Sequence, residues 1–108
     1  MQSAFSLWNC FLLYQVLCIE NGAYGKRLGK VCDVMGVDYE VLSFPENTRV
    51  DPQKVEELLR ADNSIALVSV VHCETSSGVI NPVEEVGRVV RKTLPGSLPF
   101  FSFILRLI

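Results

Sequence analysis

The segment from residue 65 to residue 71 constrains the fold of this chain more than any other. It reads Ile-Ala-Leu-Val-Ser-Val-Val, so an extended chain here is apolar on both faces apart from one serine. Strands of this kind occur in parallel sheets, because helices cover both faces of the sheet. The segment therefore predicts a buried parallel strand in an α/β fold.

Two further strands are predicted upstream. Residues 16–19 form a short, apolar, partly β-branched run that stops at the turn-favouring dipeptide Asn21-Gly22. Residues 37–41 alternate apolar and acidic side chains, which is typical of a strand with one face less buried than the other. Together with the buried run, these segments predict three strands.

A helix is predicted between the first two strands. Leu28, Cys32 and Met35 recur at helical spacing, which predicts one buried stripe along an amphipathic helix. Gly36 follows where a helix C-cap favours a residue that can adopt positive φ. We therefore expect this helix to end at Gly36 and to bury that stripe.

Two more helices are predicted by their start signals. Both Asp51-Pro52 and Asn81-Pro82 place a side-chain acceptor before a proline, which suits the first turn of a helix. The residues predicted to face inward are Val55, Leu58 and Leu59 in the first of these helices and Val83, Val86 and Val90 in the second.

The alternation of strands and helices predicts the fold class α/β, as a three-layer arrangement with a mostly parallel sheet. The chain has 108 residues, which suits one small domain. Residues 16–92 carry the alternating pattern. Residues 1–15 are interpreted as an atypical apolar N-terminus, and residues 93–108 as a divergent apolar tail.

Composition argues against several classes of partner. The net charge is -2 and there is no basic block, so nucleic acid is not an expected partner. The apolar N-terminus is interrupted by polar residues and is short for a spanning helix, so membrane association is the less favoured interpretation. The single histidine and the absence of a C-x-x-C pair predict no metal site and no disulfide framework. Free thiols indicate a reducing compartment, and we expect the cytoplasm, with the mitochondrion as the alternative.

Two loops are candidates for ligand binding. Ligands of open parallel sheets bind beyond the carboxyl ends of the strands, because loops and helix starts converge there. Residues 20–27 place Tyr24 between glycines at a helix entry, and residues 71–81 place Thr75 and two serines beside Gly78. We expect both loops to face a common crevice.

Each candidate residue also has a structural interpretation. Tyr24 could pack at the edge of the core, and the hydroxyls of residues 75–77 could bond their own backbone in a turn. Glu74 beside His72 suggests acid–base work, but the only histidine of a sequence is usually structural or solvent-facing. His72 is also badly placed to activate Cys73, because successive residues on an extended chain point in different directions. No catalytic residue is therefore assigned.

The two loops together resemble a known family. Asn-Gly-Ala-Tyr-Gly-Lys-Arg at 21–27, followed by Val-Val-His-Cys-Glu-Thr-Ser-Ser-Gly-Val-Ile-Asn-Pro at 70–82, is similar to the class V aminotransferases of fold type I. Within the family, the branch that transfers the amino group of 2-aminoethylphosphonate to pyruvate is the most similar, and the alanine:glyoxylate type comes next. The resemblance covers the middle of the large domain.

The resemblance implies a cofactor and roles for two residues. Family members use pyridoxal 5'-phosphate, on whose pyridine ring an aromatic residue at the position of Tyr24 stacks. A hydroxyl at the position of Thr75 hydrogen-bonds the cofactor near its ring oxygen. The implied partners are an amino donor and pyruvate, and the implied assembly is a homodimer.

The resemblance also implies parts that this sequence does not match. The family uses a lysine for the Schiff base and an aspartate for the pyridinium nitrogen, and no residue here matches either position. We therefore expect this chain to be inactive alone, as a truncated or mis-spliced product or an incomplete gene model. An alanine:glyoxylate-type fragment and a non-catalytic interaction module derived from the fold are the alternatives.

Overall fold

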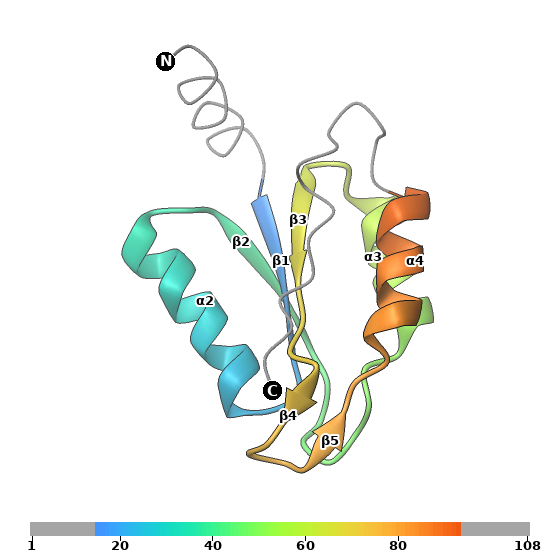
Figure 1. The fold of residues 1–108 in the computed structure, drawn as a ribbon. Helices are drawn as coiled ribbons and strands as arrows, with labels where there is room; N and C mark the ends of the chain where they lie inside the picture. Colours follow the sequence, from blue (N-terminus) through green and yellow to red (C-terminus); the bar gives the residue numbers. More distant parts are fainter. Residues whose placement is uncertain (1–14, 94–108) are drawn as a thin grey trace.

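The computed structural model describes residues 15–93 (Figure 1). Apart from Gln15 and Thr93, the apolar ends interpreted above, 1–15 and 93–108, lie outside the described residues. The helices and strands alternate as predicted, with one short hairpin added. The elements are β1 (Gln15–Glu20), α2 (Ala23–Met35), β2 (Tyr39–Ser43), α3 (Pro52–Ala61), β3 (Ile65–Ser69), β4 (Cys73–Glu74), β5 (Val79–Ile80) and α4 (Val83–Thr93).

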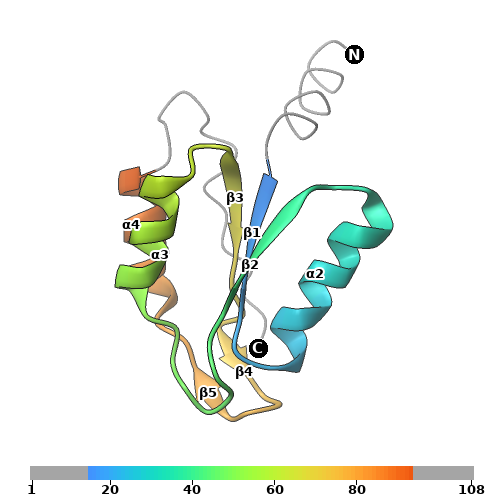
Figure 2. The ribbon, with the colours of Figure 1, turned by 180° about the vertical axis from the view of Figure 1, so that it is seen from behind.

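The main sheet has three parallel strands in the order β2-β1-β3. Helix α2 covers one face of this sheet, and helices α3 and α4 lie side by side over the other, as Figure 1 and the reverse view in Figure 2 both show. The predicted α/β class, with three layers and a parallel sheet, is confirmed. Strand β1 lies in the middle, and its residues 16–19 are all buried.

The apolar core lies between the sheet and the pair α3 and α4. Every inward residue predicted for these two helices either belongs to this core or packs against it from a partly buried position. The core residues are Leu17, Ile19, Val50, Val55, Leu59, Ile65, Val68, Val70, Val86 and Val90. The spacing of valines and leucines was therefore sufficient to predict how α3 and α4 face the sheet.

The buried stripe predicted for α2 is wrong at one end. Met35 is 60% exposed, Leu28 and Cys32 are only half-buried, and the buried residues of α2 are Gly25 and Gly29. A Cβ atom at Gly25 would lie 2.9 Å from the Cα of Glu20, and one at Gly29 would lie 3.2 Å from the ring of Tyr39. The helix thus approaches the sheet through glycines, which a search for apolar periodicity does not register.

Strand β2 begins two residues later than predicted. The predicted C-cap at Gly36 is confirmed, since this glycine adopts φ 70°, but the cap also uses the next residue: the amide of Val37 donates to the carbonyl of Cys32 over 3.0 Å. Val37, which the alternating pattern predicts to be in the strand, therefore belongs to the helix cap, and β2 begins after it. Strand β3 ends at Ser69, although Val70 and Val71 remain buried beyond it.

Three cysteines lie among the described residues, and all three are free thiols, as predicted. Cys18 is the most buried, in the centre of β1. Burial raises the pKa of the Cys18 thiol to about 12, and the neighbouring Cys32 contributes in the same direction. Among the described residues, 15–93, no helix is long and apolar enough to cross a membrane.

The close approach of α2 predicts a cost for adding one methyl group. We expect Gly25→Ala to lower the free energy of unfolding by about 1–3 kcal/mol despite the higher helix propensity of alanine, because the new Cβ would meet backbone. The exposed neighbour gives the control: Lys26→Ala should change the stability by less than about 0.5 kcal/mol. Urea denaturation measures both, and equal stabilities would contradict the packing.

The burial of Cys18 predicts an order of thiol reactivity. With a pKa of about 12, only about one thiol in ten thousand is ionised at pH 8, and the thiolate is the form that iodoacetamide alkylates. Cys32 and Cys73, both half-buried, should be modified first in the native protein. Mass spectrometry of tryptic peptides after timed alkylation measures the order. In urea the difference should vanish, and rapid native labelling of Cys18 would contradict its placement.

Candidate functional site

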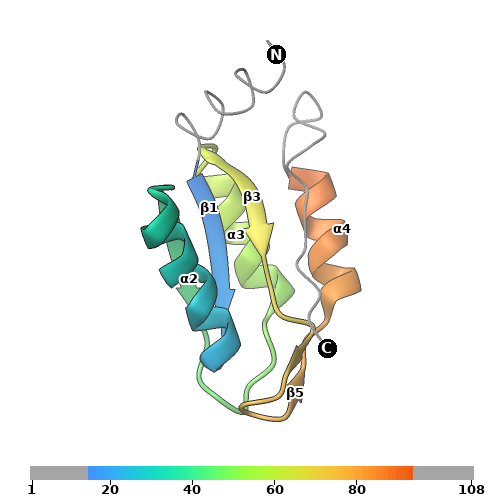
Figure 3. The same ribbon diagram turned by 60° about the vertical axis from the view of Figure 1, so that its left-hand side comes forward.

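The two candidate loops lie at the same edge of the sheet. In Figure 1 and in the rotated view of Figure 3, β1 and β3 both run toward the edge where α2 begins and where the hairpin β4–β5 lies. This is the carboxyl edge, where parallel sheets place their ligands. The predicted placement of residues 20–27 and 71–81 at one edge of the sheet is therefore confirmed.

The second loop is a hairpin rather than an irregular segment. Cys73 pairs with Ile80 and Glu74 with Val79, antiparallel, and the amides of Ser77 and Gly78 donate to the carbonyl of Glu74 over 3.1 and 2.7 Å. Gly78 adopts φ 74°, a conformation that glycine reaches without strain. Strands of two residues are too short for an alternating pattern, which is why sequence reasoning missed this hairpin.

The side chain of Glu74 is fully buried and lies at the start of α2. Its carboxylate accepts hydrogen bonds from the amide of Gly25 over 3.0 Å, from the amide of Tyr24 over 3.4 Å and from the hydroxyl of Ser76 over 2.9 Å. The Ser76 hydroxyl oxygen in turn accepts from the amide of Ala23 over 3.0 Å. Three successive amides of the first turn are thus satisfied by one hairpin, about fifty residues away in the sequence.

Helix α2 needs this remote cap because it has none of its own. Gly22 occupies the N-cap position without a side chain, and the first turn contains no acidic residue. The first amides of a helix need acceptors, and the helix dipole places partial positive charge there. This deficit is visible in the sequence and indicates a remote acceptor, although the sequence pattern suggests Glu74 only as a partner of His72.

A second buried polar group joins the same edge. Asn21 and Asn81 exchange side-chain hydrogen bonds of 2.7 and 3.1 Å. Asn21 also donates to the carbonyl of Thr48, while Asn81 donates to the carbonyl of Val71 and accepts from the amide of Val50. The segments that follow β1, β2 and β3 are therefore tied together by two amide side chains, each only 2% exposed.

The two residues expected to bind a cofactor lie on these joined segments. Tyr24 is in the first turn of α2 with its side chain 39% exposed, and the guanidinium carbon of Arg27 lies 5.2 Å from the centre of its ring. Thr75 is exposed in the hairpin, between Glu74 and Ser76, which both contact the start of α2. Both side chains are accessible at one edge, although their binding roles stay predictions.

The neighbours of Thr75 have structural roles. The hydroxyl of Ser77 donates to the carbonyls of Asn21 and Glu74 over 3.4 Å, so it bonds the backbone, as the turn-former interpretation predicted. His72 is half-buried, and its carbonyl accepts from the amide of Asn81 over 2.7 Å. Between residues 15 and 93, no three metal-ligating side chains form a cluster.

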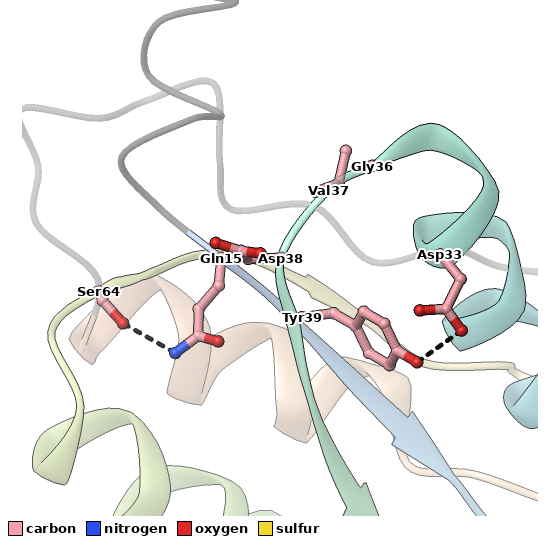
Figure 4. A pocket seen from close by; sticks show the side chains of 7 residues that line it. All are labelled: Gln15, Asp33, Gly36, Val37, Asp38, Tyr39 and Ser64. Carbon is pink, nitrogen blue, oxygen red and sulfur yellow. Dashed lines mark hydrogen bonds between the residues drawn. The ribbon is translucent and has the colours of Figure 1, made fainter.

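A hollow lined by described residues lies at the opposite, amino edge of the sheet. It measures about 670 Å³ and contains two hydrogen bonds, from Tyr39 to Asp33 and from Gln15 to Ser64, both of 2.9 Å (Figure 4). Its remaining lining residues are Gly36, Val37 and Asp38. Because loops and helix starts of a parallel sheet converge at the other edge, we do not assign a cofactor here.

Comparison with known proteins agrees with this geometry. The family model described as Aminotransferase class-V matches residues 21–97. The 2-aminoethylphosphonate–pyruvate transaminase of Pseudomonas fluorescens is 47% identical over 76 residues, which are 70% of this chain and 21% of that protein. Its counterpart in Pseudomonas aeruginosa is 45% identical over 78 residues, 72% of this chain and 21% of that protein. The chain thus spans about a fifth of the length of these relatives.

Solved structures show the same fold. A pyridoxamine–pyruvate aminotransferase from Mesorhizobium loti superposes with a TM-score of 0.70 at 28% identity, covering 90% of this chain and 24% of that one. An alanine–glyoxylate aminotransferase from Nostoc superposes with a TM-score of 0.69 at 24% identity, covering 97% of this chain and 26% of that one. The second supports the fold alone.

The buried amide pair predicts that Asn81 is a large contributor to stability. We expect Asn81→Ala to lower the free energy of unfolding by about 2–4 kcal/mol, because it leaves the carbonyl of Val71 and the amide of Val50 buried without this partner. The exposed Asn63 gives a matched control, since Asn63→Ala should change stability by less than about 0.5 kcal/mol. Urea denaturation followed by circular dichroism measures both, and a neutral Asn81→Ala would contradict the network.

Proposed function

The chain belongs to the class-V aminotransferases, and we propose that it is part of the cofactor-binding domain of a transaminase that moves the amino group of 2-aminoethylphosphonate to pyruvate. The observation that carries the proposal is the meeting of the Tyr24 and Thr75 segments at the carboxyl edge, joined through Glu74. Transaminases that are named for this donor and acceptor share 40–47% sequence identity with the matched part of the chain, which supports the choice of substrates.

The residues at this edge fit pyridoxal 5'-phosphate. An accessible aromatic ring at Tyr24 offers a flat surface for a pyridine ring, and the exposed hydroxyl of Thr75 offers a hydrogen bond. Arg27, whose guanidinium carbon lies 5.2 Å from the centre of the Tyr24 ring, adds positive charge beside this surface, which suits an anionic cofactor. When bound, the cofactor withdraws electrons from the substrate, and the residues of this chain would hold and orient it.

The four lysines of the chain all lie on helices: Lys26 and Lys30 on α2, Lys54 on α3 and Lys92 on α4. All four are exposed, and none is on the hairpin that carries Thr75. A transaminase needs a lysine at the reacting carbon of the cofactor. We therefore propose that this polypeptide does not transaminate alone, and that activity belongs to a longer, dimeric form in a reducing compartment such as the cytoplasm.

Two alternatives remain open. An enzyme of the alanine–glyoxylate type is the first, because the fold seen in the Nostoc structure does not by itself distinguish between substrates. A non-catalytic module that packs against a full-length subunit is favoured by the exposed apolar residues Val31, Val34 and Met35 of α2, of which Val34 is 87% exposed.

A chimera tests the proposed function directly. The 76 matched residues of the Pseudomonas fluorescens transaminase can be replaced by those of this chain, which restores the rest of the enzyme around them. We expect the chimera to bind pyridoxal 5'-phosphate and to transfer the amino group of 2-aminoethylphosphonate to pyruvate. The 108-residue chain, assayed beside it, should form no alanine above background and no borohydride-trapped lysine adduct.

Substitutions in the chimera separate the roles of the two residues from those of the fold. Tyr24→Ala and Thr75→Val should each weaken cofactor binding by about 2- to 10-fold, since stacking and a single hydrogen bond contribute about 0.5–1.5 kcal/mol each. Glu57→Gln, at an exposed position of α3, is the control and should leave binding unchanged. A folded chimera that binds no cofactor, or turnover by the isolated chain, would contradict the proposal.

A further inference from the structure

We propose that Glu74 is a positioning residue, which sets the segment bearing Tyr24 against the segment bearing Thr75 without itself contacting the cofactor. The inference rests on the proposed function for the identity of the ligand. The contacts that carry it are internal to the described residues.

Glu74 holds both segments at once. Its side-chain carboxylate binds the amides of Tyr24 and Gly25, whereas its backbone carbonyl binds the amides of Ser77 and Gly78. Thr75 lies inside the turn that these two carbonyl contacts close. Glu74 therefore sets the start of α2 relative to the turn that carries the hydroxyl, and the contacts of Ser76 and Ser77 add to it.

A local cap could not do the same. A serine or aspartate at the N-cap would satisfy the first amides of α2 within the helix and would leave the hairpin unattached. Here the N-cap is Gly22, and a Cβ at this position would overlap the Cγ of Glu74 and would lie 2.7 Å from the Oγ of Ser76. Gly22 is extended, so the requirement for glycine is steric: it makes room for the remote carboxylate.

The same contacts exclude one location for the phosphate of the cofactor. Helix starts commonly bind phosphate through free amides. At α2 the amides of Ala23, Tyr24 and Gly25 are already engaged by Ser76 and by a buried negative charge. The start of α2 therefore presents Tyr24 to the ring of the cofactor, and its phosphate has to be held by other residues.

Amide hydrogen exchange of the 108-residue chain tests the positioning role. In Glu74→Gln the glutamine keeps the shape but turns an NH₂ group toward donors, so we expect exchange at Tyr24, Gly25 and Gly78 to accelerate about 10- to 100-fold relative to amides of β1. Gly22→Ala, which displaces Glu74 from the opposite side, should accelerate the same amides. Glu57→Gln is the control and should accelerate none of them.

A merely local role gives a different pattern. If Glu74→Gln accelerates Gly78 alone and leaves Tyr24 and Gly25 protected, Glu74 stabilises only its own hairpin and the proposal is overturned. Inorganic phosphate is a second probe: the amide signals of Tyr24 and Gly25 should not shift on its addition to the wild-type chain, and a saturable shift would overturn the exclusion of phosphate from α2.

A binding experiment separates this inference from the proposed function. The probe is 4'-deoxypyridoxine 5'-phosphate, which lacks the aldehyde and so needs no lysine. If the wild-type chain shows signal shifts at Tyr24 and Thr75, Glu74→Gln should weaken the binding at least 5-fold. Equal binding by wild type and Glu74→Gln, with loss in Tyr24→Ala, overturns the role of Glu74 only. If the wild-type chain shows no shifts, the chimera decides the proposed function and hydrogen exchange decides the role of Glu74.

Discussion

A carboxylate without access to water holds together the edge of the sheet on which the candidate ligand residues lie. Burying an unpaired carboxylate is very costly, so the carboxylate of Glu74 can stay there only because its oxygens are hydrogen-bonded. Charge-assisted hydrogen bonds contribute about 1.5–3 kcal/mol each, and the positive end of α2 adds to them. The first amides of α2 have no acceptor within the helix, and the buried carboxylate of the hairpin needs donors. The hydrogen bonds between them meet both needs.

The amide pair of Asn21 and Asn81 extends this arrangement across the sheet. This pair and Glu74 hold the loops at the edge of the sheet by directed hydrogen bonds. Among residues 15–93, every buried side-chain nitrogen or oxygen has a hydrogen-bond partner. Such networks specify one arrangement because partly satisfied alternatives are expensive. Tyr24 and Thr75 stay accessible beside these hydrogen-bonded side chains, which suits a candidate site that is formed before its ligand binds.

The predictability of the fold differs between the two faces of the sheet. The α3 and α4 face was predictable because its contacts are made by valine and leucine side chains at helical spacing, such as Val55, Leu59, Val86 and Val90. The α2 face was not, because Gly25 and Gly29 make the closest contacts there and leave no apolar signal. The start of β2 was misplaced for a similar reason, since the cap of α2 uses Val37.

The sequence by itself determined the class of the fold, the order of its strands and helices, and the two loops that resemble the class-V aminotransferases. These depend on local propensity, spacing and motif, which are properties of contiguous residues. Only the tertiary structure decided that residues 73–80 form a hairpin, that Asn21 pairs with Asn81 and that Glu74 caps α2. The hairpin strands are too short to show an alternating pattern. The other two features join groups about fifty to sixty residues apart, and no local pattern records which distant donor a buried acceptor will meet. The loop that contains Thr75 was found from its motif, and its attachment to Tyr24 only from its contacts.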